Sequence, residues 1–397
     1  MHTRHSIYCI LPPHVLTKIA QNGTSVQQEK AMQTIVATEQ LRGRRRGIDS
    51  MASFSMPLGG TNNKQRTIYD AKTGSGLPGL LVRAEGGPLS ADAAVNEAYD
   101  GSGVTYDLYS NIFHRNSIDG NGLKLDSTVH YQKSYDNAFW DGRQMVYGDG
   151  DEDMPVEHRL FNRFTIAIDV IGHELTHGVT QNEANLAYWD QSGALNESMS
   201  DVFGSLVKQY QRKESAKDAD WLIGAGLLSS NVKGVALRSM KAPGTAYDDP
   251  VLGKDPQPGY MKDFINTTQD NGGVHMNSGI PNHAFYVIAY NLGGFAWDKA
   301  GQIWYKTLTD KLTERSTFQD AANLTYQAAG ELFGSGSMEQ IAVKYGWAEV
   351  GLTVDTGIPV PVPTTPPPGS VSIPGGGCLE QIIRGLGLAG PTKPSGK

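Results

Sequence analysis

The sequence contains very little cysteine. Its 397 residues include two cysteines, Cys9 and Cys378, which lie near opposite ends of the chain. Two such distant cysteines form no disulfide framework, so cysteine usage does not demand an oxidising compartment. Any stability in a harsh medium must therefore come from packing or from ions.

Long apolar runs and a strong excess of one charge are also missing. No run approaches the roughly 20 apolar residues of a membrane-spanning helix. The net charge of −7 argues against a surface built for nucleic acid or anionic membrane, so neither is expected as a partner. Residues 1–21 lack the apolar core of a secretory signal, because Pro12, Pro13, His14 and Lys18 interrupt it.

Composition divides the chain into four expected regions. Residues 1–50 form a small module that ends in a basic, glycine-punctuated segment. Residues 51–165 are rich in Gly, Asp, Asn and Tyr with short alternating runs, which predicts a β-rich domain. Residues 166–354 show helical periodicity and predict an α-helical domain. Residues 355–397 hold a Pro- and Gly-rich tail that we expect to be mostly disordered.

The helical periodicity predicts individual helices as well. In the helical domain they cover residues 164–178, 194–211, 280–292, 298–312 and 317–333. In the N-terminal module, Ser25 and Gln28 predict a capping box for a helix that carries Met32, Ile35 and Val36 at helical spacing. From this segment alone, a small N-terminal lobe and a propeptide with a processing loop behind it are equally supported.

Two short segments carry most of the chemical information. His-Glu-Leu-Thr-His at 173–177 places His173 and His177 one helical turn apart, so both imidazoles can reach one ion. Gly-Ala-Leu-Asn-Glu-Ser-Met-Ser-Asp at 193–201 supplies Glu197 from a second helix. Two neutral nitrogens, one carboxylate and an open fourth position are typical of a catalytic site with one Zn²⁺ per chain.

Two further carboxylates fit the chemistry of such a site. Glu174 is placed to take a proton from zinc-bound water and pass it to the leaving nitrogen. Asp201 can accept the free ring N–H of a zinc-bound histidine and so fix its tautomer. The competing interpretation is a solvated helix face with two incidental histidines. The apolar residues Ile166, Val170 and Ile171 favour instead a helix buried on one side.

Between about residues 67 and 354 the chain resembles the thermolysin-like zinc metallopeptidases. The similarity rests on the two zinc segments, on their spacing and on three further motifs: Asn137-Ala138-Phe139-Trp140, Val146-Tyr147-Gly148-Asp149-Gly150 and Asp270-Asn271-Gly272-Gly273-Val274-His275. The resemblance implies an α+β fold with a β-rich N-terminal domain, a mainly α-helical C-terminal domain and the zinc site in the cleft between them. It also implies a secreted, monomeric endopeptidase that acts on proteins or peptides. Because no signal was found, an intracellular location is the alternative.

The resemblance assigns roles to several residues. His275 would hydrogen-bond the oxyanion of the tetrahedral intermediate, Asp270 would orient its ring, and Tyr188 would donate to the same oxygen. Asn137 and Ala138 would form the edge strand that pairs with the substrate backbone. Taken without the family, a histidine after two glycines is more often a loop or packed residue.

The resemblance also implies a specificity. Arg238 matches an arginine that holds a substrate carbonyl near the primary pocket; a solvated arginine is the alternative. The residues that match this pocket are apolar and predict cleavage on the N-terminal side of bulky hydrophobic residues. They are Phe161, Phe164, Val170 and Leu237. Trp140 is given no chemical role, since it could equally be ordinary core.

Residues 1 to about 50, with Leu11-Pro12-Pro13 near the start, look like the compact propeptide of the protealysin subgroup. That similarity implies a zymogen whose own propeptide is the inhibitor. Bonds before bulky apolar residues, such as Gly47–Ile48 and Ser53–Phe54, are candidates for self-processing. Cys9 raises the idea of a thiolate on the open zinc position, although a small, partly buried cysteine is the usual case.

Calcium is where the chain departs from its relatives. Other family members bind a pair of Ca²⁺ ions near the active site through several carboxylates, of which Asp169 and Asp220 match two here. Lys208 and two apolar residues occupy the other positions and cannot bind calcium. We expect Lys208 to bridge the two aspartates, so a double calcium site is not expected. A further acidic cluster expected around residues 82–86 contains Arg83, so a calcium site is not expected there either.

Two other classes of protein remain as competing interpretations. One is a catalytically silent protein that binds zinc or peptides on the same fold. The other is an intracellular interaction scaffold, suggested by the missing signal and the proline-rich tail. Glu174, Tyr188 and His275 occur together, which favours the enzyme because a binding-only protein has no reason to keep all three.

Overall fold

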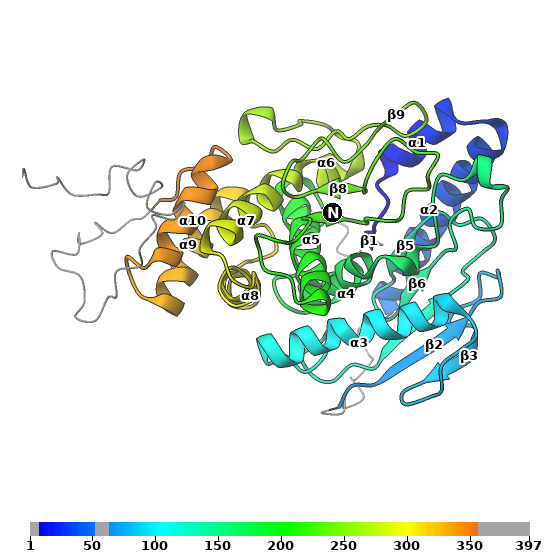
Figure 1. Ribbon diagram of the computed structural model, residues 1–397, viewed down its shortest axis with the longest axis horizontal. Coiled ribbons are helices and arrows are strands. Elements are labelled where there is room, and N and C mark those ends of the chain that lie inside the picture. Colours follow the sequence, from blue (N-terminus) through cyan, green and yellow to red (C-terminus); the bar gives the residue numbers. More distant parts are fainter. Residues whose placement is uncertain (1–7, 52–62, 356–397) are drawn as a thin grey trace, which may run out of the picture.

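The computed structural model describes residues 8–51 and 63–355, and of residues 42–51 the backbone only. A six-stranded mixed sheet lies at one end of the molecule and a group of helices at the other (Figure 1). The strands, in spatial order, are β1 (Tyr8–Cys9), β5 (Ala138–Trp140), β6 (Met145–Tyr147), β4 (Leu125–Val129), β2 (Arg66–Asp70) and β3 (Leu80–Ala84). The pairs β2–β4 and β4–β6 are parallel, and the other neighbouring pairs are antiparallel.

A long helix, α3 (Ala93–Phe113), packs beside this sheet in the region for which the sequence predicted mainly strands. Asp92 caps its N-terminus, because the Asp92 side chain accepts the main-chain N–H of Ala94 at 2.9 Å. Its buried face is built largely from small residues and tyrosines, among them Ala98, Gly101 and Tyr109. The helical period of large apolar residues is therefore weak, which is why the pattern did not reveal the helix.

The second domain is helical, as predicted. Its helices are α4 (Ile168–Asn182), α5 (Asp190–Arg212), α6 (Asp270–Asn277), α7 (Gly279–Leu292), α8 (Ala300–Asp310), α9 (Phe318–Phe333) and α10 (Met338–Glu349). All five predicted helices are present with shifted ends, whereas α6 and α10 were not predicted. The first begins late because residues 164–166 form the separate 3₁₀ turn η3 (Phe164–Ile166). A mixed sheet joined to a helical domain confirms the predicted fold class.

Short elements lie before and between these helices. Two small hairpins are formed by β7 (Leu222–Ile223) with β8 (Arg238–Ser239) and by β9 (Asp248–Asp249) with β10 (Gly253–Lys254). Two further 3₁₀ turns are η2 (Val156–His158) and η4 (Met261–Asp263). The hairpin β7–β8 matters most for the site, because it carries Arg238.

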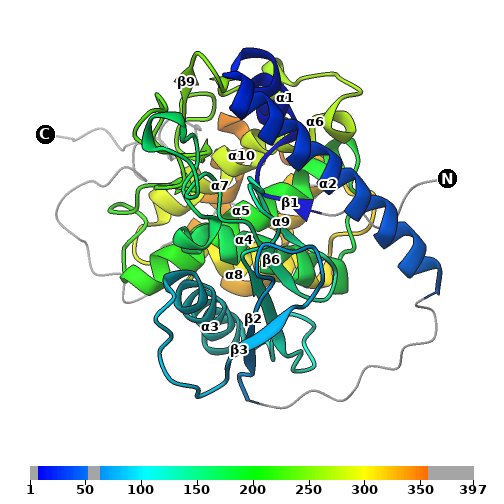
Figure 2. The same ribbon diagram turned by 90° about the vertical axis from the view of Figure 1, so that its right-hand side faces the viewer.

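The N-terminal module consists of β1, α1 (Pro13–Asn22) and α2 (Ser25–Met51), and α2 crosses one face of the molecule (Figure 2). The predicted capping box is displaced by one residue. The N–H of Thr24 donates to Gln27 Oε1 at 2.8 Å, and the N–H of Gln27 lies 3.5 Å from Thr24 Oγ1. Met32 and Val36 face outward at 51% and 50% exposure. The buried face of α2 instead includes polar residues that bind the catalytic part of the chain.

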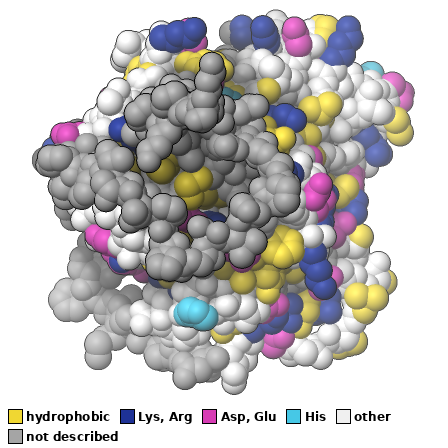
Figure 3. All heavy atoms as spheres, turned by 60° about the vertical axis from the view of Figure 1, so that its left-hand side comes forward, with side chains coloured by type: hydrophobic (Ala, Val, Ile, Leu, Met, Phe, Trp, Pro, Cys, Tyr) yellow, Lys and Arg dark blue, Asp and Glu magenta, His cyan; other side chains and the backbone are white. Residues whose placement is uncertain are grey.

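Parts of the sequence lie outside this description. They include the last candidate processing bond, Ser53–Phe54, and the expected tail after residue 355. Among the described helices, none combines the length and apolar character needed to cross a bilayer. Figure 3 shows the side that carries the C-terminal helices, where acidic and basic side chains are interspersed over the described surface.

Candidate metal centre and active site

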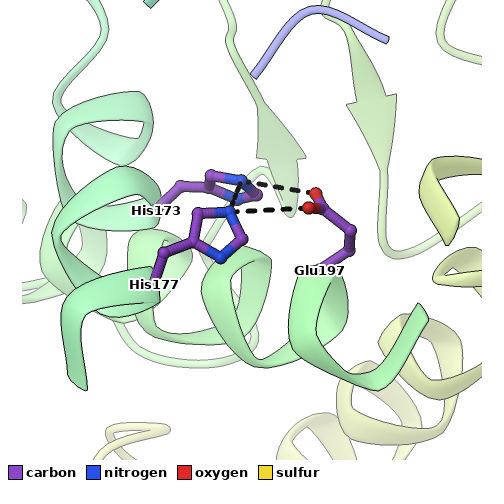
Figure 4. A group of neighbouring side chains, drawn as sticks. All are labelled: His173, His177 and Glu197. Atoms are coloured by element: carbon purple, nitrogen blue, oxygen red, sulfur yellow. Dashed lines mark hydrogen bonds and ion pairs between the residues drawn. The ribbon is translucent and has the colours of Figure 1, made fainter. Parts of the chain in front are cut away.

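Three donor side chains meet between α4 and α5, the two helices of the chain that contact each other most (Figure 4). His173 and His177 come from α4 and Glu197 from α5, and all three are at most 1% exposed. The two Nε2 atoms are 3.1 Å apart, and each lies 3.5 Å from a carboxylate oxygen of Glu197. The predicted ligand set is thus assembled in one buried place.

Hydrogen bonds orient both imidazoles. His173 Nδ1 donates to Asp201 Oδ1 at 2.8 Å, as the sequence predicted. His177 Nδ1 donates to Asn196 Oδ1 at 2.8 Å, and Ser200 Oγ lies 3.0 Å from the same nitrogen. A proton held on Nδ1 leaves the lone pair of Nε2 free for a metal ion. Asn196 and Ser200 were missed, although both lie in the segment 193–201.

The electrostatics of the centre suit a divalent cation. Burial alone would lower the pKa of His173, but Asp201 and Glu197 outweigh it and raise that pKa to about 9. Burial lowers the pKa of His177 to about 3. Burial works to raise the pKa of Glu197, yet the neighbouring histidines hold it well below its ordinary value. Glu197 Oε2 is buried without a hydrogen-bond partner, which a metal ion would supply. Two imidazoles and a carboxylate are a typical zinc donor set.

Glu174 lies next to the ligands and is completely buried. Its Oε2 accepts the main-chain N–H of Trp140 at 3.0 Å, whereas its Oε1 is buried without a hydrogen-bond partner. Burial raises the pKa of Glu174 well above its ordinary value. A carboxylate with a high pKa and one open oxygen is suited to take up a proton. Trp140 therefore acts through its main chain, a contribution that side-chain motifs do not reveal.

The residues predicted to stabilise the oxyanion also come together. Asp270 Oδ1 lies 2.7 Å from His275 Nδ1, and its Oδ2 accepts the main-chain N–H of His275 at 2.9 Å. The hydroxyl of Tyr188 lies 3.2 Å from His275 Nε2 and donates a short hydrogen bond to Glu197. Positive φ values inside α6, including 86° at Gly272, allow Asp270 and His275 to approach each other. A Cβ there would lie 2.9 Å from the main-chain nitrogen of Asp190, which explains the glycine.

Strand β5 pairs with a segment of the N-terminal module, whose strand β1 forms the edge of the sheet. The N–H of Ile10 donates to the carbonyl of Ala138 at 3.2 Å. The N–H of Leu11 donates to Asn137 Oδ1 at 3.0 Å, and Asn137 Nδ2 donates back to the carbonyl of Leu11 at 3.4 Å. Asn137 and Ala138 thus bind an extended main chain of the protein itself, and their pairing with a substrate stays a prediction.

Arg238 is buried rather than solvated, with 2% of its surface exposed. Its guanidinium forms two hydrogen bonds to Asp201, at 2.8 and 2.7 Å, and a third to the carbonyl of Ile10 at 3.0 Å. Asn282 Nδ2 adds a donor to Asp201 at 2.8 Å. One carboxylate therefore links the peptide-binding arginine to the metal-binding His173. Asn282 was missed because its contact spans 81 residues of sequence.

The four residues assigned to the primary pocket are all interior. Phe161, Phe164, Val170 and Leu237 are at most 3% exposed and belong to the same continuous apolar cluster as Ile10. Ile10 itself is fully buried. The side chain of Ile10 is thus embedded in the same apolar core as the four residues predicted to form the primary pocket.

The side chain of Cys9 does not reach the metal centre. It packs in a separate apolar cluster, which includes Tyr131 and Phe139. Its thiol is absent from the donor group formed by the two histidines and Glu197. Neighbouring side chains of a strand point to opposite faces. Tyr8 accordingly stacks on His177, with ring centroids 4.3 Å apart. The geometry contradicts the idea of a thiolate on zinc.

At the place expected for calcium, the structure has an ammonium group. Lys208 Nζ lies 2.9 Å from Asp169, 2.8 Å from Asp220 and 2.5 Å from the carbonyl of Leu222. At the second expected site, the guanidinium of Arg83 lies 3.6 Å from the ring centre of Tyr99. Both positions thus contain a basic side chain of the protein.

Comparison with known proteins agrees with this geometry. Residues 50–181 match the catalytic domain of thermolysin metallopeptidase, and residues 184–352 match its alpha-helical domain. An extracellular metalloprotease of Pectobacterium carotovorum is 51% identical over 88% of this chain and 97% of its own length. A bacillolysin of Bacillus cereus is 43% identical over 73% of the chain and half of its own length.

A solved structure is similar over nearly the same range. The precursor of protealysin, a metalloproteinase from Serratia proteamaculans, shares 51% sequence identity with a TM-score of 0.77. The match covers 87% of this chain and all of that one. Since both domain families and the zinc donor set agree, this chain belongs to the thermolysin family of zinc metallopeptidases.

Proposed function

We propose that this metallopeptidase cleaves peptide bonds on the N-terminal side of bulky apolar residues and is made as a zymogen. The observation that carries the specificity is the burial of Ile10. Its carbonyl is held by Arg238, and its side chain lies in the cluster that contains Phe161, Val170 and Leu237. A residue bound in this way would follow the scissile bond, so Leu, Ile, Phe, Val and Met are expected there.

Separate residues of the site have separate roles in hydrolysis. Zinc, when bound, polarises the substrate carbonyl and lowers the pKa of water. Glu174 takes the proton of the attacking water through its open oxygen, while the Trp140 N–H fixes the other. His275 and Tyr188 donate to the oxygen that becomes negative, which is worth roughly 3 kcal/mol of transition-state stabilisation for a single donor. Asp270 holds the ring of His275 in place.

We further propose that the N-terminal module is a propeptide that inhibits the enzyme. Its strand β1 extends the sheet at β5, where a substrate would pair. A second attachment lies on α2, where Lys30 Nζ is 2.5 Å from Asp151 and 3.2 Å from the carbonyl of Gly150. Both attachments are buried, so a substrate cannot enter until the module leaves. Processing is expected between residues 42 and 54.

The names of two relatives support export. The proteins from Pectobacterium carotovorum and Serratia marcescens are called extracellular metalloproteases. We propose that this enzyme is also exported and that it acts as a monomer on protein or peptide substrates. Size-exclusion chromatography with light scattering on the zinc-loaded protein would reveal a dimer, which would contradict the proposed monomer.

A peptide assay tests the proposed activity. The matured enzyme is incubated with two quenched peptides that differ only in having Leu or Asp after the scissile position. We expect rapid cleavage before Leu, cleavage before Asp slower by at least about 100-fold, and loss of both with a zinc chelator. Equal rates for the two peptides would contradict the specificity. The Glu174→Ala protein is the control for contaminating proteases.

A further inference from the structure

We propose that the enzyme hydrolyses a bond within its own N-terminal module, the peptide bond between Cys9 and Ile10. This inference rests on the proposed function and extends it to a particular substrate. It differs from processing between residues 42 and 54, which separates the module from the catalytic domain. The argument depends on the register in which β1 lies in the site.

The carbonyl oxygen of Cys9 is at the oxyanion position. It lies 3.1 Å from His275 Nε2, and the hydroxyl of Tyr188 lies 3.2 Å from the same nitrogen. Asp270 holds the opposite ring nitrogen of His275, so Nε2 is directed at this oxygen. The imidazole that would stabilise a tetrahedral intermediate thus contacts the carbonyl of Cys9, and the hydroxyl of Tyr188 lies beside that imidazole.

The residues after this carbonyl occupy the positions of a leaving peptide. Ile10 donates its N–H to the carbonyl of Ala138, and its own carbonyl accepts from Arg238. Leu11 exchanges two hydrogen bonds with the side chain of Asn137. The arginine and the asparagine therefore bind consecutive residues in the order expected after a scissile bond.

The residues before the bond also pair as a substrate would. Tyr8 lies opposite Trp140 and Cys9 opposite Phe139 in the antiparallel pair β1–β5. The ring of Tyr8 stacks on His177, next to the metal centre. Main-chain pairing thus continues on both sides of the Cys9–Ile10 bond. Trp140, which lies opposite Tyr8 in this pairing, donates its main-chain N–H to Glu174.

The reaction is an ordinary hydrolysis and needs no reactant other than water. The water oxygen forms a bond to the carbonyl carbon of Cys9, and the bond from that carbon to the nitrogen of Ile10 breaks. Glu174 takes one proton from the water and passes it to the leaving nitrogen. The products are a carboxylate at Cys9 and an amino group at Ile10. The portion after the cut stays bound through Arg238, Asn137 and the helices α1 and α2.

The full-length, zinc-loaded chain provides the test. Wild type and Glu174→Ala are incubated at several protein concentrations, and intact mass and amino-terminal sequencing are followed over time. We expect the wild type to gain a new amino terminus at Ile10 at a rate independent of concentration, as a reaction within one molecule requires. Glu174→Ala should show no such cut.

Substitution of Ile10 tests the register. Ile10→Asp places a charge in an apolar site and should slow the cut by at least about 100-fold, whereas Ile10→Leu should preserve it. Ile10→Leu also remains informative if the Asp variant does not fold. A wild type that processes itself between residues 42 and 54 and releases a module with an intact Cys9–Ile10 bond would overturn this inference, while its activity on peptides would uphold the proposed function. A wild type that cleaves neither itself nor any peptide would overturn both.

Discussion

The main-chain N–H of Trp140 lies 3.0 Å from Oε2 of Glu174 and joins strand β5 to helix α4, which carries two of the three metal ligands. One oxygen of the proposed general base is thereby fixed by the strand with which we expect a substrate to pair. The other is left without a hydrogen-bond partner. The domain that contains the sheet and the domain that contains the metal donors thus meet at this carboxylate.

Replacing Glu174 with Gln should lower kcat of the matured enzyme by about 100-fold to 10,000-fold, because the proton acceptor is lost. Zinc content should remain at one ion per chain, since Glu174 is not a ligand. Peptide hydrolysis and metal analysis are the measurements. His177→Ala is the matched control and should lose zinc as well. A Gln variant with more than a tenth of the wild-type rate would exclude the proposed role.

Replacing Lys208 with Met should lower the free energy of unfolding by about 3–5 kcal/mol, because Asp169 is left as an unpaired buried charge. Denaturant unfolding of the full-length chain measures the change. Lys306→Ala removes an exposed ion pair with Asp310 and should cost less than about 1 kcal/mol.

The ammonium of Lys208 at the expected calcium site predicts that the melting temperature does not depend on calcium. A chelator selective for calcium should shift the melting temperature of the zinc-loaded wild type by less than about 2 °C, which corresponds to less than about 1 kcal/mol. Differential scanning calorimetry with and without the chelator measures this shift in melting temperature. A large drop would mean that calcium binds elsewhere in the chain.

His130 should make stability fall at alkaline pH. It lies 2.9 Å from Asp149 and 2.7 Å from Asp92, and the hydrogen bond with Asp149 is the main cause that raises its pKa to about 9. This pKa is above the unfolded value of about 6.5. The contribution of His130 to the free energy of unfolding is therefore complete below pH 6.5 and disappears as pH rises through 9. After allowance for solvent screening it is on the order of 1–2 kcal/mol.

Urea unfolding at pH 6 and at pH 9.5 measures this effect. The difference between wild type and His130→Gln should be large at the lower pH and small at the higher one. Other groups titrate equally in both proteins, so their contributions cancel in the comparison. A difference that stays constant between the two pH values would show that the charge of His130 contributes nothing.

Asn137→Ala should reduce kcat/KM of the matured enzyme by about 30-fold. The variant loses two hydrogen bonds to the peptide main chain, each worth about 1 kcal/mol. Most of the change should appear in KM, because these bonds form in the ground state as well as in the transition state. Gln327→Ala, an amide on the exposed face of α9, is the matched control. An unchanged KM would contradict the role of Asn137 in substrate binding.

Much of this site was predictable because ligand chemistry imposes sequence spacing. His173 and His177 had to be four residues apart on a helix, and Asp201 had to follow Glu197 by one turn. The Asp270–His275 motif was recognised in the same way, by family resemblance. Side chains fixed by local helical spacing leave a clear pattern in the sequence.

The missed contributions share a different physical origin. Trp140 acts through a main-chain N–H, which no side-chain pattern records. Asn282 reaches Asp201 across 81 residues, and Thr24 instead of Ser25 caps α2 because either hydroxyl could do so. Helix α3 was missed because small residues build its buried face. These features are decided by tertiary packing rather than by local periodicity.

The ammonium of Lys30 also bears on how readily the module leaves. The ammonium lies 2.5 Å from Asp151 and 3.7 Å from Asp136, and even beside this cation burial raises the pKa of Asp136 well above its ordinary value. When the module leaves, the ammonium of Lys30 and the carboxyl groups beside it return to water, which recovers the cost of their dehydration. Hydration thus offsets part of the loss of this buried contact, so the contact attaches the module without preventing its release.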